Sequence, residues 1–326
     1  MIAQVEKKYC GAVDVGGTKI SSALFTLEGD MLHKNKISID KSRAEKSVHQ
    51  IIEIINTLER YAREEEGEIK AVGIAIPGVV FHKTGLIWAP NIPGWDRLPL
   101  RDEIQKKVKI PLVLDSDRSA YVLGEQWCGI AKGKRHVVFL AVGTGIGAGI
   151  IIDGRLCRGS EDIAGAVGWF ALNSQFKKEY AEMGCFEAEA SGNSVGRRAI
   201  ELIKAGESSI MEEMVKGNIE NITAKTVVEA ALKEDPLAKK VLDSTIEYLA
   251  MGIANVVSIL NPEIIVLGGG LFQAGRMLLE PVRKEFTKWA QPLALQKVRI
   301  ELSRLGEDAG LYGVGKLAWE HRTNKS

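Results

Sequence analysis

The sequence predicts an α/β protein made of two similar lobes that face a cleft. One observation is length, because 326 residues exceed the roughly 100–200 residues of a typical single domain. The other is a repeated plan, in which a glycine-containing hairpin begins each half, at Asp14–Lys19 and at Val142–Gly147. We expect a first lobe over residues 1–117, closed by a C-terminal helix at about 308–326, and a larger lobe over residues 118–307.

The first half alternates short apolar runs with one long amphipathic segment. Its first three strands should form an antiparallel meander, because each is short, rich in apolar residues and bounded by turn residues. Residues 44–65 place apolar side chains at helical spacing against a charged face. The expected strands cover residues 12–15, 20–25, 31–34, 71–76 and 112–114, and the expected helices cover 44–65, 98–108 and 119–128.

The second half repeats this plan and ends in longer helices. Asp153-Gly154 is a typical two-residue hairpin turn after a strand. The expected strands cover residues 137–142, 148–152, 264–267 and 298–302, and the expected helices cover 225–234, 237–260, 276–289 and about 308–321.

Composition excludes several classes of partner. A formal net charge of +1 gives no reason to expect a nucleic acid or an anionic membrane as partner. No run approaches the roughly 18 uncharged apolar residues that span a bilayer, and the first residues lack the apolar core of a secretory signal. The four cysteines are far apart and form no CxxC pair, which favours a reducing, cytoplasmic compartment.

The glycine turns are candidate sites for the phosphates of ATP. Backbone N–H groups bind phosphate where the chain approaches closely, and glycine permits both that approach and turns with positive φ. The alternative for each is a plain tight turn. The candidate residues are Gly16, Gly17, Thr18 and Lys19 in the first hairpin, Gly143, Thr144, Gly145 and Gly147 in the second, and Gly268, Gly269 and Gly270, which follow a strand and could approach the adenosine.

Asp14 stands on the strand just before the first hairpin. A carboxylate there could help to hold a hydrated Mg²⁺ beside the phosphates, because Mg²⁺ keeps several waters and often takes only one or two carboxylates. The alternative is a hydrogen bond within the hairpin. The better-known nucleotide motifs are absent, since the chain has no GxxxxGK[ST] sequence and the glycines at 143–149 run into a strand.

The order of these signals along the chain resembles the ROK family of bacterial repressors, open reading frames and sugar kinases. The resemblance covers nearly the whole chain. It rests on Asp14-Val-Gly-Gly-Thr18, Gly73-Ile-Ala-Ile-Pro-Gly78, Ala89-Pro-Asn-Ile-Pro-Gly-Trp95, Gly143-Thr-Gly-Ile-Gly147, Gly184-Cys-Phe-Glu-Ala-Glu-Ala-Ser-Gly192, Asn261-Pro-Glu-Ile-Ile-Val-Leu-Gly-Gly-Gly270 and Asp308-Ala-Gly-Leu-Tyr-Gly313.

The resemblance implies an actin/hexokinase-like ATPase fold, with a sugar and Mg-ATP in the cleft between the lobes, and a homodimer. Because the first hairpin begins by residue 14, we expect no N-terminal helix-turn-helix of the kind that repressors of the family carry. The expected function is ATP-dependent phosphorylation of a hydroxyl on a sugar-like molecule. The alternative is a non-catalytic regulatory protein of the family that binds a sugar or a nucleotide.

The catalytic base that the resemblance implies is Asp117. In the family this aspartate lies in an Asn-Asp-Ala-Asn segment, eight residues before the Glu of a Gly-Glu pair. Gly124-Glu125 sets the register here, and Ser116 and Ser119 replace the two asparagines. Asp115 is a rival at the same strand end.

The family's sugar contacts carry over in part. Asn91 and Glu187 match, and Asp117 and Ser116 stand at two further contact positions. The family's Gly-Glu-x-Gly-His segment reads Gly165-Ala-Val-Gly-Trp169, so Ala166 replaces a carboxylate and Trp169 replaces the histidine. Trp169 either fills the vacated space as core or stacks on a sugar ring. Glucose is therefore not assumed as the acceptor.

That histidine is also a zinc ligand in many members, together with three cysteines of a CxCxxxxC run. Only Cys185 remains in this part of the chain. A tetrahedral structural zinc needs four nitrogen or sulfur ligands. We therefore expect no structural zinc, and the expected cofactors are ATP and Mg²⁺.

Overall fold

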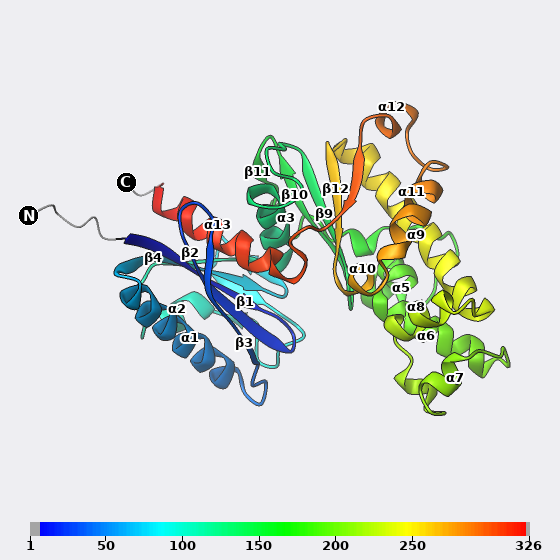
Figure 1. Cartoon of the computed structure of the whole chain (residues 1–326), viewed down its shortest axis with the longest axis horizontal. Helices are drawn as coiled ribbons and strands as arrows, with labels where there is room; N and C mark the ends of the chain where they lie inside the picture. Colours follow the sequence, from blue (N-terminus) through cyan, green and yellow to red (C-terminus); the bar gives the residue numbers. More distant parts are fainter. Residues whose placement is uncertain (1–6, 324–326) are drawn as a thin grey trace, which may run out of the picture. The chain divides into compact units, whose positions relative to one another are not determined.

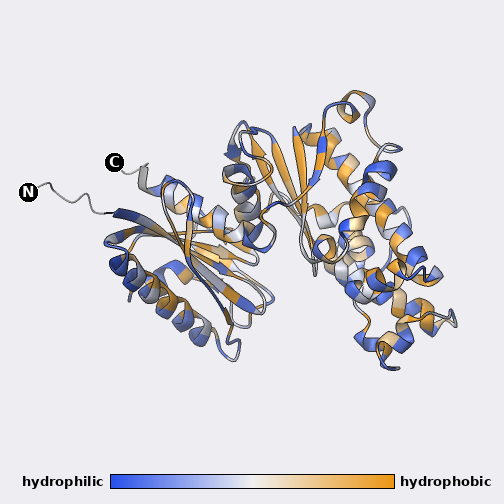
Figure 2. Ribbon diagram, viewed as in Figure 1, coloured by the Kyte–Doolittle hydropathy of each residue, from blue (hydrophilic) through white to orange (hydrophobic). Residues whose placement is uncertain are grey.

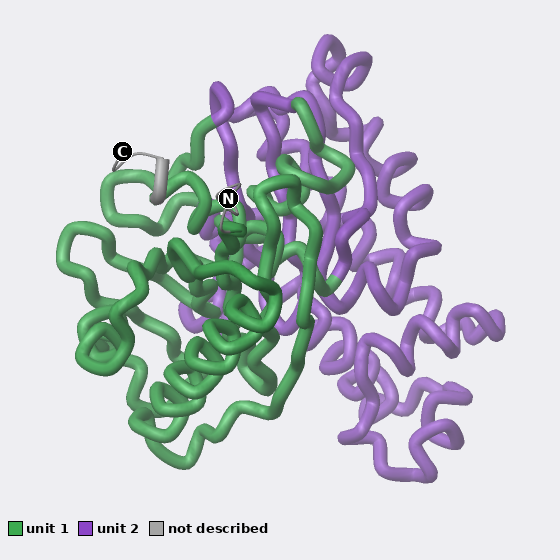
Figure 3. The backbone as a smooth tube through the Cα atoms, turned by 60° about the vertical axis from the view of Figure 1, so that its left-hand side comes forward, with its two compact units in different colours: residues 1–133, 155–164, 307–326 green, residues 134–154, 165–306 purple. Residues whose placement is uncertain are grey.

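The computed structural model describes residues 7–323, which form two compact units (Figures 1 and 3). The first unit groups the residues up to Gly133 with residues 155–164 and with those from Glu307 onward. The second unit holds residues 134–154 and 165–306. The lobe boundary expected at residue 117 falls at the start of helix α3 (Asp117–Trp127), which this division leaves inside the first unit.

The first unit contains a five-stranded sheet of order β3-β2-β1-β4-β8. The expected antiparallel meander is confirmed, because β2 pairs antiparallel with both β1 and β3. β4 runs parallel to β1 and to β8. The strands are β1 (Lys7–Val15), β2 (Lys19–Phe25), β3 (Met31–Ser38), β4 (Gly67–Ile76) and β8 (Leu112–Ser116).

A second, smaller sheet of the first unit was not expected from the sequence. It is antiparallel and consists of β5 (Val79–Phe81), β6 (Leu86–Trp88) and β7 (Asp96–Leu98). Each strand has only three residues, which is too short for an alternating pattern of apolar and polar residues to be recognised.

Helices cover both faces of the larger sheet in the first unit (Figure 1). Helix α1 (Ala44–Glu64) buries Ile51, Ile55 and Leu58 in one cluster with apolar side chains of the sheet. Helix α2 (Leu100–Gln105) lies within the range expected to be helical but is shorter. The unit also includes β11 (Arg155–Leu156), which begins the segment of residues 155–164, and η4 (Gly306–Asp308) leads into its last helix, α13 (Ala309–Thr323).

Helices α13 and α3 pack closely on the other face, and a glycine makes this possible. A Cβ added to Gly313 would lie 1.8 Å from the carbonyl oxygen of Ala120. No side chain fits there, so the small residue sets the distance between the helices. This contact holds α3, whose first residue is Asp117, against the sheet.

The sheet of the second unit repeats the plan of the first. β9 (Val137–Val142) pairs antiparallel with β10 (Ile146–Ile152) and parallel with β12 (Ile264–Gly268), and β12 pairs parallel with β13 (Arg299–Leu302). The order β10-β9-β12-β13 therefore matches β2-β1-β4-β8, and the predicted repeat is confirmed. The Asp153-Gly154 turn has φ of 51° and 78°, as the predicted two-residue turn requires. Figure 2 shows that these strands are predominantly hydrophobic.

Helix α9 (Pro236–Leu260) is the longest of the second unit and was predicted almost to the residue. Its start is set by Asp235, whose carboxylate accepts the Ala238 N–H at 2.8 Å, and by a proline at the first helical position. It ends where Asn261 adopts a left-handed conformation with φ of 41°. No helix within the described residues combines the length and apolar character needed to span a bilayer.

The remaining short elements of the second unit follow the sequence less closely. The single helix expected at 276–289 is η3 followed by α11, which ends at Phe286. There the hydroxyl of Thr287 donates to the Lys284 carbonyl at 2.8 Å and so competes with helix continuation.

The short elements of the second unit are η1 (Val167–Trp169), α4 (Tyr180–Met183), α5 (Cys185–Ala190), α6 (Gly192–Lys204), α7 (Met211–Met214), η2 (Ile219–Asn221), α8 (Ala224–Leu232), α10 (Gly270–Ala274), η3 (Arg276–Leu278), α11 (Leu279–Phe286) and α12 (Pro292–Leu295).

A buried carboxylate, Glu189 of α5, holds the irregular segment of residues 170–184 in place. It accepts hydrogen bonds from Lys177 at 2.5 Å, from Arg198 at 2.6 Å and from the hydroxyl of Tyr180. Burial alone would raise the pKa of Glu189, but the bonds from Lys177 and Tyr180 and the charge of Arg198 outweigh it, and the pKa is lowered. The carboxylate is therefore charged and fully bonded. We call these four residues the Glu189 network.

Replacing Glu189 by Ala should destabilise the second unit strongly. The change leaves Arg198 and Lys177 without their anion, and removing one partner of a buried ion pair typically costs about 3–5 kcal/mol. The free energy of unfolding, measured by urea denaturation, should fall by that amount. Glu220→Ala is the matched control, because Glu220 and its partner Lys204 are both exposed and such pairs contribute about 0–1 kcal/mol. Equal losses in the two variants would contradict the role of the network.

Candidate active site

Three acidic side chains lie at the carboxyl ends of parallel strands in the first unit. Asp14 is the penultimate residue of β1, Asp115 is that of β8, and Asp117 follows β8 directly. Both strands flank β4 and run parallel to it, so their carboxyl ends meet at one edge of the sheet. In open sheets of this kind, ligands bind at that edge.

Asp117 is placed by the start of α3. Ser116 caps the helix, because its side chain accepts the Ser119 N–H at 3.2 Å. Asp117 is partly buried, and this burial raises the pKa of its carboxyl to about 6. The charge and backbone N–H of Arg118 and the hydroxyl of Tyr121 act in the opposite direction. A carboxylate of this pKa is charged at neutral pH and basic enough to accept a proton.

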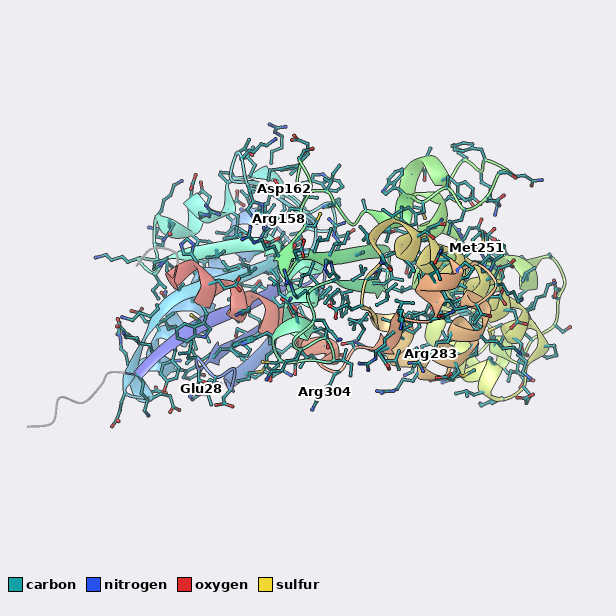
Figure 4. All side chains as sticks on the ribbon, turned by 90° about the horizontal axis from the view of Figure 1, so that it is seen from above. Glu28, Arg158, Asp162, Met251, Arg283 and Arg304 are labelled. Carbon is teal, nitrogen blue, oxygen red and sulfur yellow. The ribbon has the colours of Figure 1, made fainter. Side chains whose placement is uncertain are left out.

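Asp115 has a different environment two residues earlier. Its side chain is almost fully buried, and its Oδ2 accepts hydrogen bonds from Nε and Nη2 of Arg158 at 2.9 and 2.5 Å. Its Oδ1 accepts the Ser116 N–H at 2.8 Å. Arg158 belongs to the segment of residues 155–164, where Figure 4 also labels Asp162. Both oxygens of Asp115 are thus engaged inside the first unit.

Asp14 lies in a region of negative charge. Burial raises the pKa of its carboxyl to about 7, and the charges of Asp117 and Asp308 add to this shift, whereas Lys36 opposes it. Such a group gains from a nearby cation. No cluster of three or more His, Cys, Asp or Glu side chains suited to a metal occurs in residues 7–323. A single carboxylate still fits Mg²⁺, which takes its other ligands from water and phosphate oxygens.

The first glycine hairpin is a short turn with exposed residues at its tip. The Gly16 N–H donates to the Lys19 carbonyl at 2.8 Å, and Thr18 and Lys19 are exposed. A Cβ added to Gly17 would meet no atom within 4 Å, so the chain is open on that side. A ligand could approach the backbone there.

In the second unit, the two remaining glycine clusters lie side by side. A Cβ added to Gly143 would be 3.8 Å from the Gly270 nitrogen, and one added to Gly269 would be 2.4 Å from the Val142 carbonyl oxygen. Residues far apart in the sequence therefore line one end of β9 and β12.

Positive φ, one of the two reasons expected for glycine at these turns, was wrong for most of them. Of the glycines expected to contact ATP, all within the described residues, only Gly269 has a positive φ, at 90°. Some of the others need the absence of a side chain, whereas Gly17 and Gly270 have open space where a Cβ would stand. Gly145 is the clearest case, because a Cβ there would lie 2.5 Å from Oε2 of Glu187.

Glu187 of α5 holds the second glycine hairpin. Its Oε2 accepts the Ile146 N–H at 2.7 Å, and burial raises the pKa of its carboxyl. The residue expected to bind the acceptor thus also contacts the hairpin expected to bind phosphate.

The other expected acceptor contacts differ in exposure. Asn91 is exposed at the tip of a loop that is anchored by fully buried Trp95, whose indole donates to Ser47 Oγ at 3.0 Å. Ser116 is buried as the helix cap. Trp169 is 57% exposed, so the interpretation of this side chain as core is wrong. Its stacking role stays a prediction.

Sequence reasoning missed two neighbours of the acidic residues. Tyr121 bonds to Asp117 and stands four residues later on the same helix, a spacing that brings side chains together and could have identified it. Arg158 is 43 residues from Asp115, and no local pattern connects the two.

Comparison with known proteins places these features in a family. The ROK family model matches residues 10–321. The glucokinase of Halalkalibacterium halodurans is 32% identical over 96% of this chain and 95% of its own length, and the xylose repressor of Caldicellulosiruptor bescii is 29% identical over 92% and 75%. The crystal structure of a ROK family glucokinase from Streptomyces griseus, in complex with glucose and AMPPNP, superposes with a TM-score of 0.77 at 29% identity, covering 96% of this chain and 99% of that one.

The matched range includes every residue proposed for the site, and the structural match confirms the expected actin/hexokinase-like ATPase fold. A family model that spans nearly the whole chain, together with a relative of this identity and coverage, settles the classification. The chain belongs to the ROK family.

Proposed function

We propose that this protein is an ATP-dependent kinase that phosphorylates a hydroxyl group of a sugar-like acceptor. The observation that carries the proposal is Asp117, a partly buried carboxylate with a pKa of about 6 at the carboxyl end of a central strand. By the resemblance, Asp117 stands in place of the family's catalytic aspartate, and relatives of this chain are named glucokinases.

In this mechanism Asp117 accepts the proton of the attacking hydroxyl while the γ-phosphoryl group is transferred in line. General-base assistance of this kind is typically worth about 10²–10⁴-fold in rate. Asn91 and Glu187 are assigned to orient the acceptor by hydrogen bonds. Asp115 is unsuited to the role of base because Arg158 and the Ser116 N–H occupy its oxygens.

The phosphates of ATP are assigned to the backbone N–H groups of the two glycine hairpins, with Thr18, Lys19 and Thr144 as side-chain donors. Asp14 would hold Mg²⁺, directly or through a water molecule. Bound Mg²⁺ would neutralise phosphate charge during transfer. The Gly268–Gly270 turn is assigned to the adenosine, because it lies beside the second hairpin.

The acceptor is not carried over from the relatives. Ala166 and Ser116 stand where the family has a carboxylate and an asparagine, and a site built to bond particular hydroxyls rejects acceptors that leave its polar groups unpaired. We also propose, from the family resemblance alone, a cytoplasmic homodimer without a structural zinc.

The xylose repressor among the relatives favours a second candidate, a regulatory protein that binds a sugar without catalysis. The two proposals differ in one observable, which is turnover of ATP in the presence of an acceptor.

ADP release should be stimulated by at least one acceptor in a panel of hexoses, hexosamines, N-acetylhexosamines, polyols and sugar acids. The reason is that correct binding of the acceptor places its hydroxyl beside Asp117. A coupled assay measures the release, and omission of Mg²⁺ is the control. Binding of panel members without any stimulated release would favour the regulatory protein.

Asp117→Asn should lower kcat by about 10²–10⁴-fold, because the amide cannot accept the proton. Asp115→Asn is the matched variant at the same strand end. It should weaken the contact with Arg158 and lower stability while keeping most of kcat. Steady-state kinetics and thermal unfolding of both variants test the assignment. If only Asp115→Asn abolishes turnover, the register of the base is wrong.

Activity should fall in acid because Asp117 must be deprotonated. With a pKa of about 6, the acceptor kcat/KM at saturating Mg-ATP should fall about tenfold for each unit below that pH. The groups that face this carboxyl are Asp14 on β1 and Arg118 and Tyr121 on α3. Bound Mg²⁺ would favour the charged form of Asp117 and so shift this fall in kcat/KM to lower pH. A profile that rises in acid, or the same step in the residual activity of Asp117→Asn, would contradict the assignment.

A further inference from the structure

Arg118 is a cation beside the proposed base, and its guanidinium forms no ion pair within the described residues. It is partly exposed in the first turn of α3. Its charge lowers the pKa of the Asp117 carboxyl, against the larger effect of burial. Among the described residues, no ion pair of 4.0 Å or less joins its guanidinium to an Asp or Glu side chain. A guanidinium in this state is available to a ligand.

Two acids near the end of β8 already have partners. Arg158 neutralises Asp115 at 2.5 Å, and Asp162 accepts both the ring Nδ1 of His82 at 2.8 Å and its backbone N–H at 2.9 Å. These contacts occupy the acids next to β8. Asp115 therefore does not supply the missing partner of Arg118, nor would it repel an anion that bound there.

Two differences from the family's sequence also make the proposed site more positive. By the resemblance to the family, Arg118 stands in place of an alanine and Ala166 in place of a carboxylate. Relative to the family, these two positions have thus gained one positive charge and lost one negative charge. A neutral hexose offers nothing to compensate for either change, whereas an anionic acceptor does so for both.

We propose that Arg118 determines specificity by pairing with an anionic group of the acceptor, so that the substrate is an acidic sugar derivative bearing a carboxylate or a phosphate. This inference rests on the proposed kinase function and names its substrate class. The guanidinium binds such groups by two parallel hydrogen bonds, which fixes the orientation of the acceptor as well as its charge. The hydroxyl to be phosphorylated would then be presented to Asp117, the preceding residue.

The same guanidinium could serve the γ-phosphate of ATP instead. The glycine hairpins and Asp14 already provide for the phosphates and their cation, which favours the acceptor as the partner of Arg118. The KM for ATP distinguishes the two, because a phosphate contact would raise it for every acceptor.

The experiment compares acceptors that share a carbon skeleton, with glucose, gluconate, glucuronate and glucose 6-phosphate as probes at saturating Mg-ATP. We expect kcat/KM for an acidic member to exceed that for glucose by at least about tenfold, since hydrogen bonds to charged groups are worth about 10- to 100-fold. Arg118→Ala should reduce this preference by a similar factor, mainly through the KM of the acidic acceptor, and Arg118→Lys should retain part of it.

Lys107→Ala is the matched control, because it removes one exposed positive charge from the first unit at the end of α2. It should leave the preference unchanged. Thermal unfolding verifies that each variant is folded, and Arg118→Gln replaces Arg118→Ala if the latter is not.

The possible failures are distinct. Turnover of glucose but of no acidic member overturns this inference and leaves the kinase function standing, whereas turnover of no acceptor overturns the function itself. An unchanged preference in Arg118→Ala, with a raised KM for ATP, assigns Arg118 to the nucleotide and overturns the inference.

Discussion

The structure depends on holding two carboxylates, Asp14 and Asp117, near each other at one edge of the first sheet. Burial raises the pKa values of both groups, to about 7 and about 6, and the charge of Asp117 adds to the shift of Asp14. Such an arrangement opposes folding unless the surrounding frame enforces it. Parallel strands β1, β4 and β8 supply that frame, and the contact of α13 with α3 at Gly313 keeps the second carboxylate in place. A cation that bound beside Asp14 would reduce the cost of holding these two carboxylates together.

The end of β8 shows how environment separates two identical side chains. Asp115 and Asp117 are two residues apart, yet Arg158 binds the first, while the second lies at the start of a helix with a tyrosine hydroxyl as its neighbour. The bonds from Arg158 and the Ser116 N–H give the first carboxylate a structural role. Burial makes the second more basic. Enzymes commonly assign different roles to two carboxylates in this way.

Sequence patterns predicted what local chemistry determines and missed what distant residues determine. The repeated sheet plan, the Asp153-Gly154 turn and helix α9 follow from periodicity and capping, and all were expected. The glycine turns were located correctly, but only Gly269 has a positive φ, and at Gly145 and Gly268 the requirement for glycine is steric. The small sheet β5-β6-β7 and the pairing of Arg158 with Asp115 depend on partners brought together only by folding.

Helix α5 carries Glu187, which is assigned to the acceptor and also bonds to the glycine hairpin assigned to phosphate. Glu187 binds the backbone of the glycine hairpin at Ile146, and Glu189, two residues later, gathers Lys177, Tyr180 and Arg198. The segment of residues 170–184 is the one in which the resemblance places zinc ligands, and here an ion-pair network fixes it. A buried network of this kind is sensitive to the loss of any one of its hydrogen bonds. Loss of one member would therefore disturb Trp169 and Glu187 together, because both are attached to the same segment and helix.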